Sequence, residues 1–147
     1  MKEKKGISLI VLVITIIVMI ILSGLAIVNG RDAYIVAQKT TLQTEIMQIE
    51  TLTNNYYTRR SGNLDFVTVE VTVPSGYLEQ FEGENIVNSK VTMYVIDLNK
   101  IDAEETTYGN LENGSNDRYL YSTTTKKVYY EKGLAIDNTI YYRIESK

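Results

Sequence analysis

An uninterrupted apolar run over residues 7–28 constrains the fold of this chain more than any other feature. Sixteen of its 22 residues are isoleucine, leucine or valine, and no charged residue occurs between Lys5 and Arg31. As a helix rising 1.5 Å per residue, the run would be about 33 Å long, close to the ~30 Å hydrocarbon thickness of a bilayer. We therefore predict a transmembrane helix over residues 7–28. The basic leader, residues 1–6, predicts an N-terminus in the cytoplasm and the remainder outside.

Two other kinds of N-terminal segment are alternatives to a plain anchor. Residues 24–26, with the sequence GLA, match the small-x-small pattern of a signal-peptidase site, although cleaved signals have an apolar region of only about 7–15 residues. A lipoprotein anchor requires a cysteine, and the chain contains none.

The junction between leader and apolar run supports a third interpretation. The sequence KKGISLI at residues 4–10 resembles the prepilin cleavage site of the type IV pilin and type II secretion pseudopilin superfamily. The resemblance implies that a prepilin peptidase cuts after Gly6 and methylates the new amino group of Ile7. The family usually has phenylalanine or methionine at the position of Ile7. Its major subunits carry a glutamate at the position of Val11, and loss of that glutamate is associated with some minor subunits.

Composition restricts the remaining functions. Removal of residues 1–6, which hold three lysines and one glutamate, leaves 12 basic and 17 acidic residues, a net charge of −5. This balance argues against nonspecific nucleic-acid binding, which depends on cationic surface. The absence of cysteine and histidine removes disulfides, thiol chemistry and the usual acid–base pairs, so we predict no enzyme and no cofactor. A membrane-tethered enzyme would have to rely on acidic residues that are better explained as solvated loop carboxylates: Asp97, Asp102, Glu104 and Glu105.

A helical pattern continues after the apolar run, with apolar residues spaced by three, four or seven at Ile35, Leu42, Ile46, Ile49 and Tyr56. We predict that residues 29–60 are an amphipathic continuation of the first helix, with a weak point at residues 29–30 and Gly62 as its C-terminal cap. Residues 56–60, YYTRR, would also suit an aromatic-basic patch for an anionic polymer, but capping and solvation explain them better.

Beyond residue 61 the apolar period changes from 3.6 to 2. We predict strands over residues 64–73, 91–98, 118–123, 127–131 and 139–144, joined into one antiparallel sheet of about five strands. The fold class is therefore α+β and pilin-like: a long N-terminal helix, half transmembrane and half amphipathic, packed on this sheet. The predicted divisions are leader 1–6, transmembrane helix 7–28, amphipathic helix 29–60 and an extracytoplasmic outer domain, 61–147.

Two groups of outer-domain residues are candidate sites. Residues 112–117 offer several oxygen ligands of the kind that Ca²⁺ prefers, from Glu112, Asn113, Asn116 and Asp117, although an ordinary turn is the simpler explanation. Adjacent tyrosines on a strand point to opposite faces, so one member of each pair should be buried and the other available at an interface. These interface candidates are Tyr129, Tyr130, Tyr141 and Tyr142.

The predicted function is that of an exported structural subunit, a minor pilin or pseudopilin of a type IV pilus or type II secretion-like filament. Its expected partners are other pilin or pseudopilin subunits, prepilin peptidase, the assembly platform and the membrane. The expected location is the bacterial cytoplasmic membrane, and a cell-surface filament after assembly. A permanently anchored, unprocessed extracellular binding domain is the alternative. The sequence leaves open whether the machine serves adhesion, DNA uptake or secretion.

Overall fold

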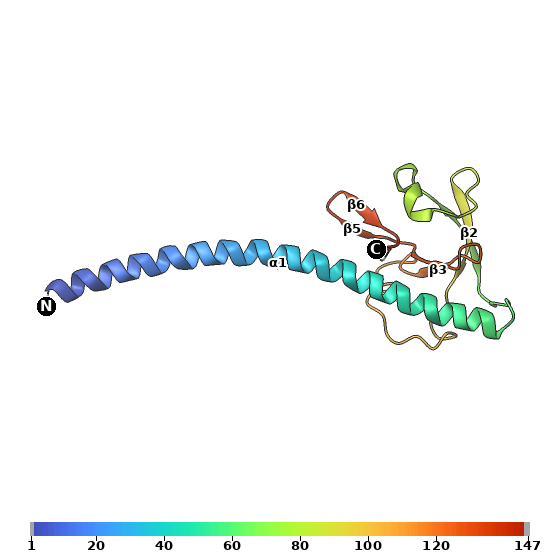
Figure 1. The fold of residues 1–147 in the computed structure, drawn as a ribbon, viewed down its shortest axis with the longest axis horizontal. Coiled ribbons are helices and arrows are strands. Elements are labelled where there is room, and N and C mark those ends of the chain that lie inside the picture. The colour runs from blue at the N-terminus through green and yellow to red at the C-terminus, as the bar shows by residue number, and fades with distance from the viewer. Residues whose placement is uncertain (1, 146–147) are drawn as a thin grey trace. The chain divides into compact units, whose positions relative to one another are not determined.

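The computed structural model describes residues 2–145, with side chains described for residues 8–22 and 30–145. The chain divides into two compact units, Met1–Gln38 and Lys39–Lys147, and the helix α1, Lys2–Arg59, contributes residues to both. We call the second of these the head unit. Figure 1 shows its strands along the cyan and green, C-terminal part of α1.

The fold class predicted from the sequence needs correction at its N-terminal half. Within the described residues, no helix is both long enough and apolar enough to cross a membrane. The predicted transmembrane half is therefore wrong for the described part of the chain.

The C-terminal part of α1 follows its predicted periodicity. Steps of three or four residues put five side chains on one face, and each of them is at most 9% exposed: Leu42, Ile46, Ile49, Thr53 and Tyr56. The helix ends at Arg59, and Gly62 adopts φ 86° while its N–H donates to Tyr57 O at 2.9 Å. This left-handed glycine satisfies a terminal carbonyl of the helix, as predicted for its C-terminus.

The predicted single sheet of five strands is wrong, because the head unit contains two antiparallel sheets. Four strands form the first, in the order β1-β2-β3-β4, and two form the second, β5-β6. The bounds are β1 Thr68–Thr72, β2 Lys90–Val95, β3 Tyr119–Tyr121, β4 Val128–Tyr130, β5 Leu134–Ile136 and β6 Thr139–Tyr141. A 3₁₀ segment, η1 Ser75–Phe81, follows β1.

The second sheet separates from the first because of a turn at Gly133. This glycine adopts φ 78°, and a Cβ added there would lie 2.3 Å from Ile140 Cγ2. The close approach lets the chain leave β4 and start a separate hairpin, in which Asp137 at φ 54° supplies the left-handed turn residue. Residues 137–138 form the turn that joins β5 to β6.

Besides its partner strand β5, β6 is hydrogen-bonded to a side chain and, among the described residues, not to a further strand. Gln80, in η1, donates through Nε2 to Ile140 O and accepts from Tyr142 N–H, both at 2.7 Å. Its amide thus pairs with a backbone acceptor in β6 and with a backbone donor at the residue that follows β6, and these two bonds connect the hairpin to η1.

The two faces of the four-stranded sheet pack against different elements. On one face, Phe81 of η1 lies in an apolar cluster and stacks on Tyr129 with ring centroids 4.8 Å apart. The other members of this cluster are Val73, Val91, Met93 and Leu120. On the opposite face, Tyr119 and Tyr121 point toward α1 and donate hydrogen bonds to it. Side chains alternate along β3, so Leu120 packs toward η1, whereas Tyr119 and Tyr121 point toward α1.

Candidate functional site

The residues of the predicted processing site lie in α1, but the side chains of Gly6 and Ile7 are outside those that the structure describes. Val11, at the position of the family glutamate, is 56% exposed, and its carbonyl accepts a hydrogen bond from Thr15 Oγ1 at 2.7 Å. All thirteen large apolar side chains between residues 9 and 22 are 45–67% exposed. This part of α1 thus presents apolar surface on every side.

Asp117, one of the four weak calcium candidates, is occupied by hydrogen bonds from the chain itself. Its side chain is fully buried, and its Oδ1 accepts from Gly109 N–H at 2.9 Å and from Tyr130 OH at 2.5 Å. Asn113 N–H donates to Oδ2 at 3.1 Å. Burial alone would raise the pKa of Asp117, but these hydrogen bonds hold it below the ordinary value.

The other calcium candidates do not join Asp117 at a shared point. Glu112, Asn113 and Asn116 are exposed. No group of three or more acidic, histidine or cysteine side chains within the described residues is placed to hold a metal ion. The hydrogen bonds identify residues 109–117 as a loop organised around one buried carboxylate.

Both members of one predicted tyrosine pair are buried. Tyr129 is 1% exposed and Tyr130 is 3% exposed, so the expectation that one of them faces outward is wrong. The reason is that β4 is covered on both sides: Phe81 stacks on Tyr129, while the rings of Tyr108 and Tyr119 lie 5.6 and 5.5 Å from Tyr130. Tyr141 and Tyr142 are half-buried, and Lys39 Nζ lies 4.8 Å above the Tyr141 ring.

Sequence reasoning missed a row of polar side chains by which α1 holds the sheet and loops. Glu45 accepts from Thr107 N–H at 2.8 Å, Tyr108 N–H at 3.1 Å and Tyr119 OH at 2.9 Å. Asn54 accepts from Tyr121 OH at 2.5 Å. Glutamates between apolar helix positions look like solvated residues in a sequence, and only the long-range contacts reveal their role.

Glu50 completes this row through a half-buried ion pair. Its Oε1 accepts from Val128 N–H at 3.0 Å and from Arg143 Nη1 at 2.7 Å, and Arg143 also donates from Nε to Glu145 at 2.8 Å. Burial by itself would lower the pKa of Arg143, but the two carboxylates raise it above the ordinary value. The helix, β4 and the C-terminal segment therefore meet at one guanidinium group.

Burial in this packing raises the pKa of tyrosine hydroxyls in the head unit. Burial raises the pKa of Tyr119 well above its usual range, and the charge of Glu45 raises it further. Burial likewise raises the pKa of Tyr121 to about 12. These side chains are neutral hydrogen-bond donors at physiological pH, and they have a structural role.

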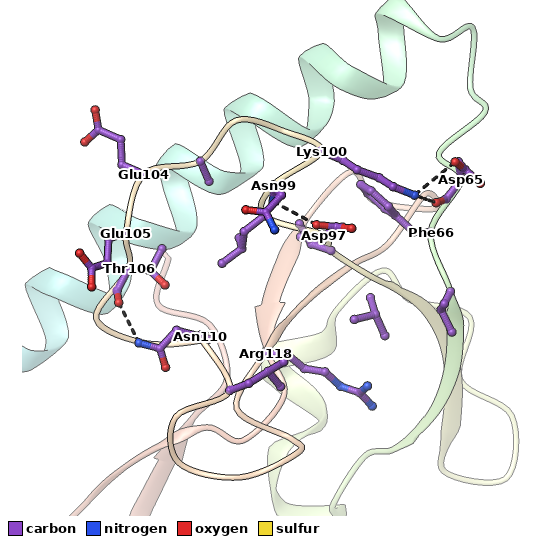
Figure 2. A pocket seen from close by; sticks show the side chains of 17 residues that line it. Asp65, Phe66, Asp97, Asn99, Lys100, Glu104, Glu105, Thr106, Asn110 and Arg118 are labelled. Carbon is purple, nitrogen blue, oxygen red and sulfur yellow. Dashed lines mark hydrogen bonds and ion pairs between the residues drawn. The ribbon is translucent and has the colours of Figure 1, made fainter.

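A hollow of about 640 Å³ opens at the end of the sheet where β1 begins and β2 ends (Figure 2). Two apolar side chains in its lining are left uncovered, Val67 at 72% and Leu111 at 60% exposure. Its two cations are already paired: Lys100 with Asp65 at 3.2 Å, and Arg118 with Glu131, which lies outside the lining. Asp97 accepts from Asn99 N–H at 3.0 Å and has no cation beside it among the described residues.

An acidic segment, residues 102–106, separates this hollow from a second one. The second hollow, of about 670 Å³, is lined by α1 residues 45–52 in part and by the same segment. Glu104 and Glu105 border both hollows, and Figure 2 shows Glu104 directed away from the first one. Thr106 Oγ1 is buried and makes no hydrogen bond within the described part of the chain. We call residues 102–106 the acidic strap.

The carboxylates of the head unit fall into two groups that differ in their surroundings. Carboxylates with several donors, such as Asp117 and Glu45, are held inside the fold, while those of the acidic strap are exposed beside uncovered apolar side chains. Comparison of the chain with protein-family models, with curated proteins and with solved structures found no match.

Proposed function

We propose that this chain is a structural subunit of a type IV pilus or type II secretion-like filament, a minor pilin or pseudopilin. The observation that carries the proposal is the exposed apolar surface of α1 between residues 9 and 22. A helix that is apolar on every side is stable in water only when other apolar groups cover it. In the proposed filament, the corresponding helices of neighbouring subunits provide that cover.

The leader sequence supplies the second line of support. Residues 4–10 carry the pattern that resembles a prepilin cleavage site, so prepilin peptidase cuts after Gly6 and methylates the amino group of Ile7. Before assembly the subunit is located at the bacterial cytoplasmic membrane. After assembly it belongs to a cell-surface filament.

Val11 supports the minor position of the proposed subunit. A glutamate there would carry a charge into apolar surroundings, where it is stable only beside a compensating amine. Valine removes both the cost of burying that charge and the contact that would fix the register of the subunit. A subunit without this contact suits a position that is occupied once, such as a filament tip, better than the repeated positions of a fibre.

The mass of the N-terminal peptide, measured on protein recovered from membranes of its own host, tests the proposal. We expect a chain that begins at Ile7 with a methylated amine. A Gly6→Val variant should keep its leader, whereas Gly24→Val, a matched change inside the apolar run, should be processed normally. A wild-type chain that begins at Met1 would contradict the proposal and favour an unprocessed, permanently anchored binding domain.

A second test concerns the place of the subunit in the filament. Val11→Glu restores the family carboxylate, and we expect it to change the amount of this subunit in sheared filaments or its position along them. Val18→Glu adds the same charge two turns later and serves as the control. Equal effects of both substitutions on filament content would show that position 11 has no special role.

A further inference from the structure

The acidic strap and its two flanking hollows form a surface with uncovered apolar side chains and uncompensated acidic charge among the described residues. Apolar side chains stand uncovered on both sides of it, Met47 at 52% exposure in the second hollow, and Val67 and Leu111 in the first. The acidic side chains therefore lie between two groups of uncovered apolar side chains on the head unit.

The charge of this surface is not compensated within the head unit. The side chains of Asp102, Glu104 and Glu105 are exposed, and none of these carboxylates makes an ion pair or a hydrogen bond with another described residue. The nearby cations Lys100 and Arg118 are held by Asp65 and Glu131. A cluster of one sign beside hollows of low polarity attracts and retains a group of the opposite sign.

The exposed apolar side chains limit what that cationic group can be. A metal ion or a small polyamine would meet the carboxylates but would leave Val67, Leu111 and Met47 exposed. A folded basic surface would reach the strap but would not enter hollows of about 640 and 670 Å³ on its two sides. An extended chain satisfies both requirements, because every second side chain points to the same side, so residues two positions apart can place cations on the strap and apolar groups in the hollows.

We propose that the acidic strap binds an extended segment of a partner protein in which lysine or arginine residues lie between apolar residues on the same side of the segment, at every second position. The cationic groups of the segment lie over Glu104 and Glu105, and its apolar side chains enter the hollows beside Leu111 and Met47. The aliphatic stems of lysine and arginine add to the apolar contact. This surface lies wholly in the head unit, and the proposal does not depend on processing at Gly6.

Fluorescence anisotropy of a labelled peptide tests the proposal on the full chain in non-ionic detergent. The probe is the nonapeptide GLSRSRSLG, whose two arginines and two leucines lie on one side of an extended chain, and its matched partner is GLSESESLG, with micelles alone as a blank. We expect saturable binding of the basic peptide that weakens as salt is raised, and no binding of the acidic one. Failure of the basic peptide to bind at low salt would overturn the proposal.

Paired charge variants separate this site from general attraction to an acidic protein. The double variant Glu104→Gln, Glu105→Gln should weaken binding about 5-fold, in keeping with the modest strength of exposed ion pairs. The control, Glu79→Gln with Glu82→Gln, removes the same charge from exposed positions that line neither hollow, and it should leave the affinity unchanged. Equal losses in both double variants would show that binding is not localised at the strap.

A third variant tests the apolar half of the surface without disturbing the fold. Leu111 adopts φ 66°, a conformation that asparagine tolerates better than leucine, so Leu111→Asn should keep the head unit folded while removing the apolar contact. We expect the affinity for the basic peptide to fall about 3-fold, because the substitution removes only a small part of the free energy gained by burying one apolar side chain. Unchanged affinity would refute the role of the hollow. Self-association of the wild-type chain that the Glu104→Gln, Glu105→Gln variant abolishes would instead assign the surface to a second copy.

Discussion

On the face of the four-stranded sheet that meets α1, the contacts include hydrogen bonds from sheet and loops to Glu45, Glu50 and Asn54. On the opposite face, Phe81 packs on Tyr129 within an apolar cluster. Apolar packing is proportional to buried area and tolerates small shifts, whereas the hydrogen bonds hold only at fixed distances and angles. The comparison therefore predicts that η1 contributes mainly stability and the helix contributes mainly the alignment of sheet and loops.

The largest expected effect comes from the apolar face. Phe81→Ala should lower the free energy of unfolding by about 4 kcal/mol, because it removes a ring that is 3% exposed and leaves a cavity against Tyr129. Urea denaturation of the full chain in non-ionic detergent measures it, with near-ultraviolet circular dichroism of the twelve tyrosines as the signal. Leu78→Ala, in the same 3₁₀ segment but 48% exposed, is the control and should change stability by less than about 1 kcal/mol.

The second effect belongs to the helix face. Arg143→Ala should cost about 3 kcal/mol, because it leaves Glu50 beside β4 without the cation that compensates it. Lys90→Ala breaks an ion pair with Glu70 in which both side chains are more than half exposed, and this control should cost about 0.5 kcal/mol or less. Similar losses in the two variants would mean that the Arg143 contacts do not hold the helix to β4.

Local patterns in the sequence explain why one part of the fold could be predicted and another could not. The 3.6-residue period correctly places Leu42, Ile46 and Ile49 on the buried face of α1, because burial along a helix repeats with its turn. The separation of β5 and β6 into their own sheet depends on the backbone at Gly133 and on the Gln80 side chain, a contact across 60 residues. No window of neighbouring residues contains that information.

The same limit applies to the candidate sites. The oxygen-rich sequence at residues 112–117 is compatible with a ligand set, although an ordinary turn is the simpler explanation, and a sequence does not show that Tyr130 and Gly109 donate hydrogen bonds to Asp117. The alternation rule assumed that one face of β4 is solvated, and it failed because the loop carrying Tyr108 covers that face. The exposure of Glu104 and Glu105 was predicted, whereas their position between two hollows depends on the fold.

The third prediction concerns the buried carboxylate under the loop of residues 109–117. Asp117→Asn should cost about 2 kcal/mol at pH 7, because an uncharged amide accepts fewer of the three hydrogen bonds and offers donors where donors already point. The pKa of Asp117 is lowered in the folded chain, so its contribution is present above the unfolded value of about 3.9 and is lost as pH falls through the folded value. The difference between wild type and variant should therefore shrink below pH 4 in acid titrations followed by circular dichroism. Glu112→Ala, an exposed neighbour, should show no such dependence.

The smallest effect at neutral pH is that of a single hydroxyl on the helix face. Tyr121→Phe should cost about 1 kcal/mol at pH 7, because it removes the hydrogen bond to Asn54 while keeping the buried ring. Burial raises the pKa of Tyr121 to about 12 in the folded chain, against about 10 in the unfolded one. The unfolded chain therefore ionises first as pH rises, and the stability that Tyr121 contributes below pH 10 is lost progressively toward pH 12. The variant should be less stable than wild type at pH 7 and should lose less stability between pH 10 and pH 12, as measured by urea denaturation across that range. Parallel curves for the two proteins would mean that the Tyr121 hydroxyl is accessible to solvent, and that the polar row of α1 does not extend to β3.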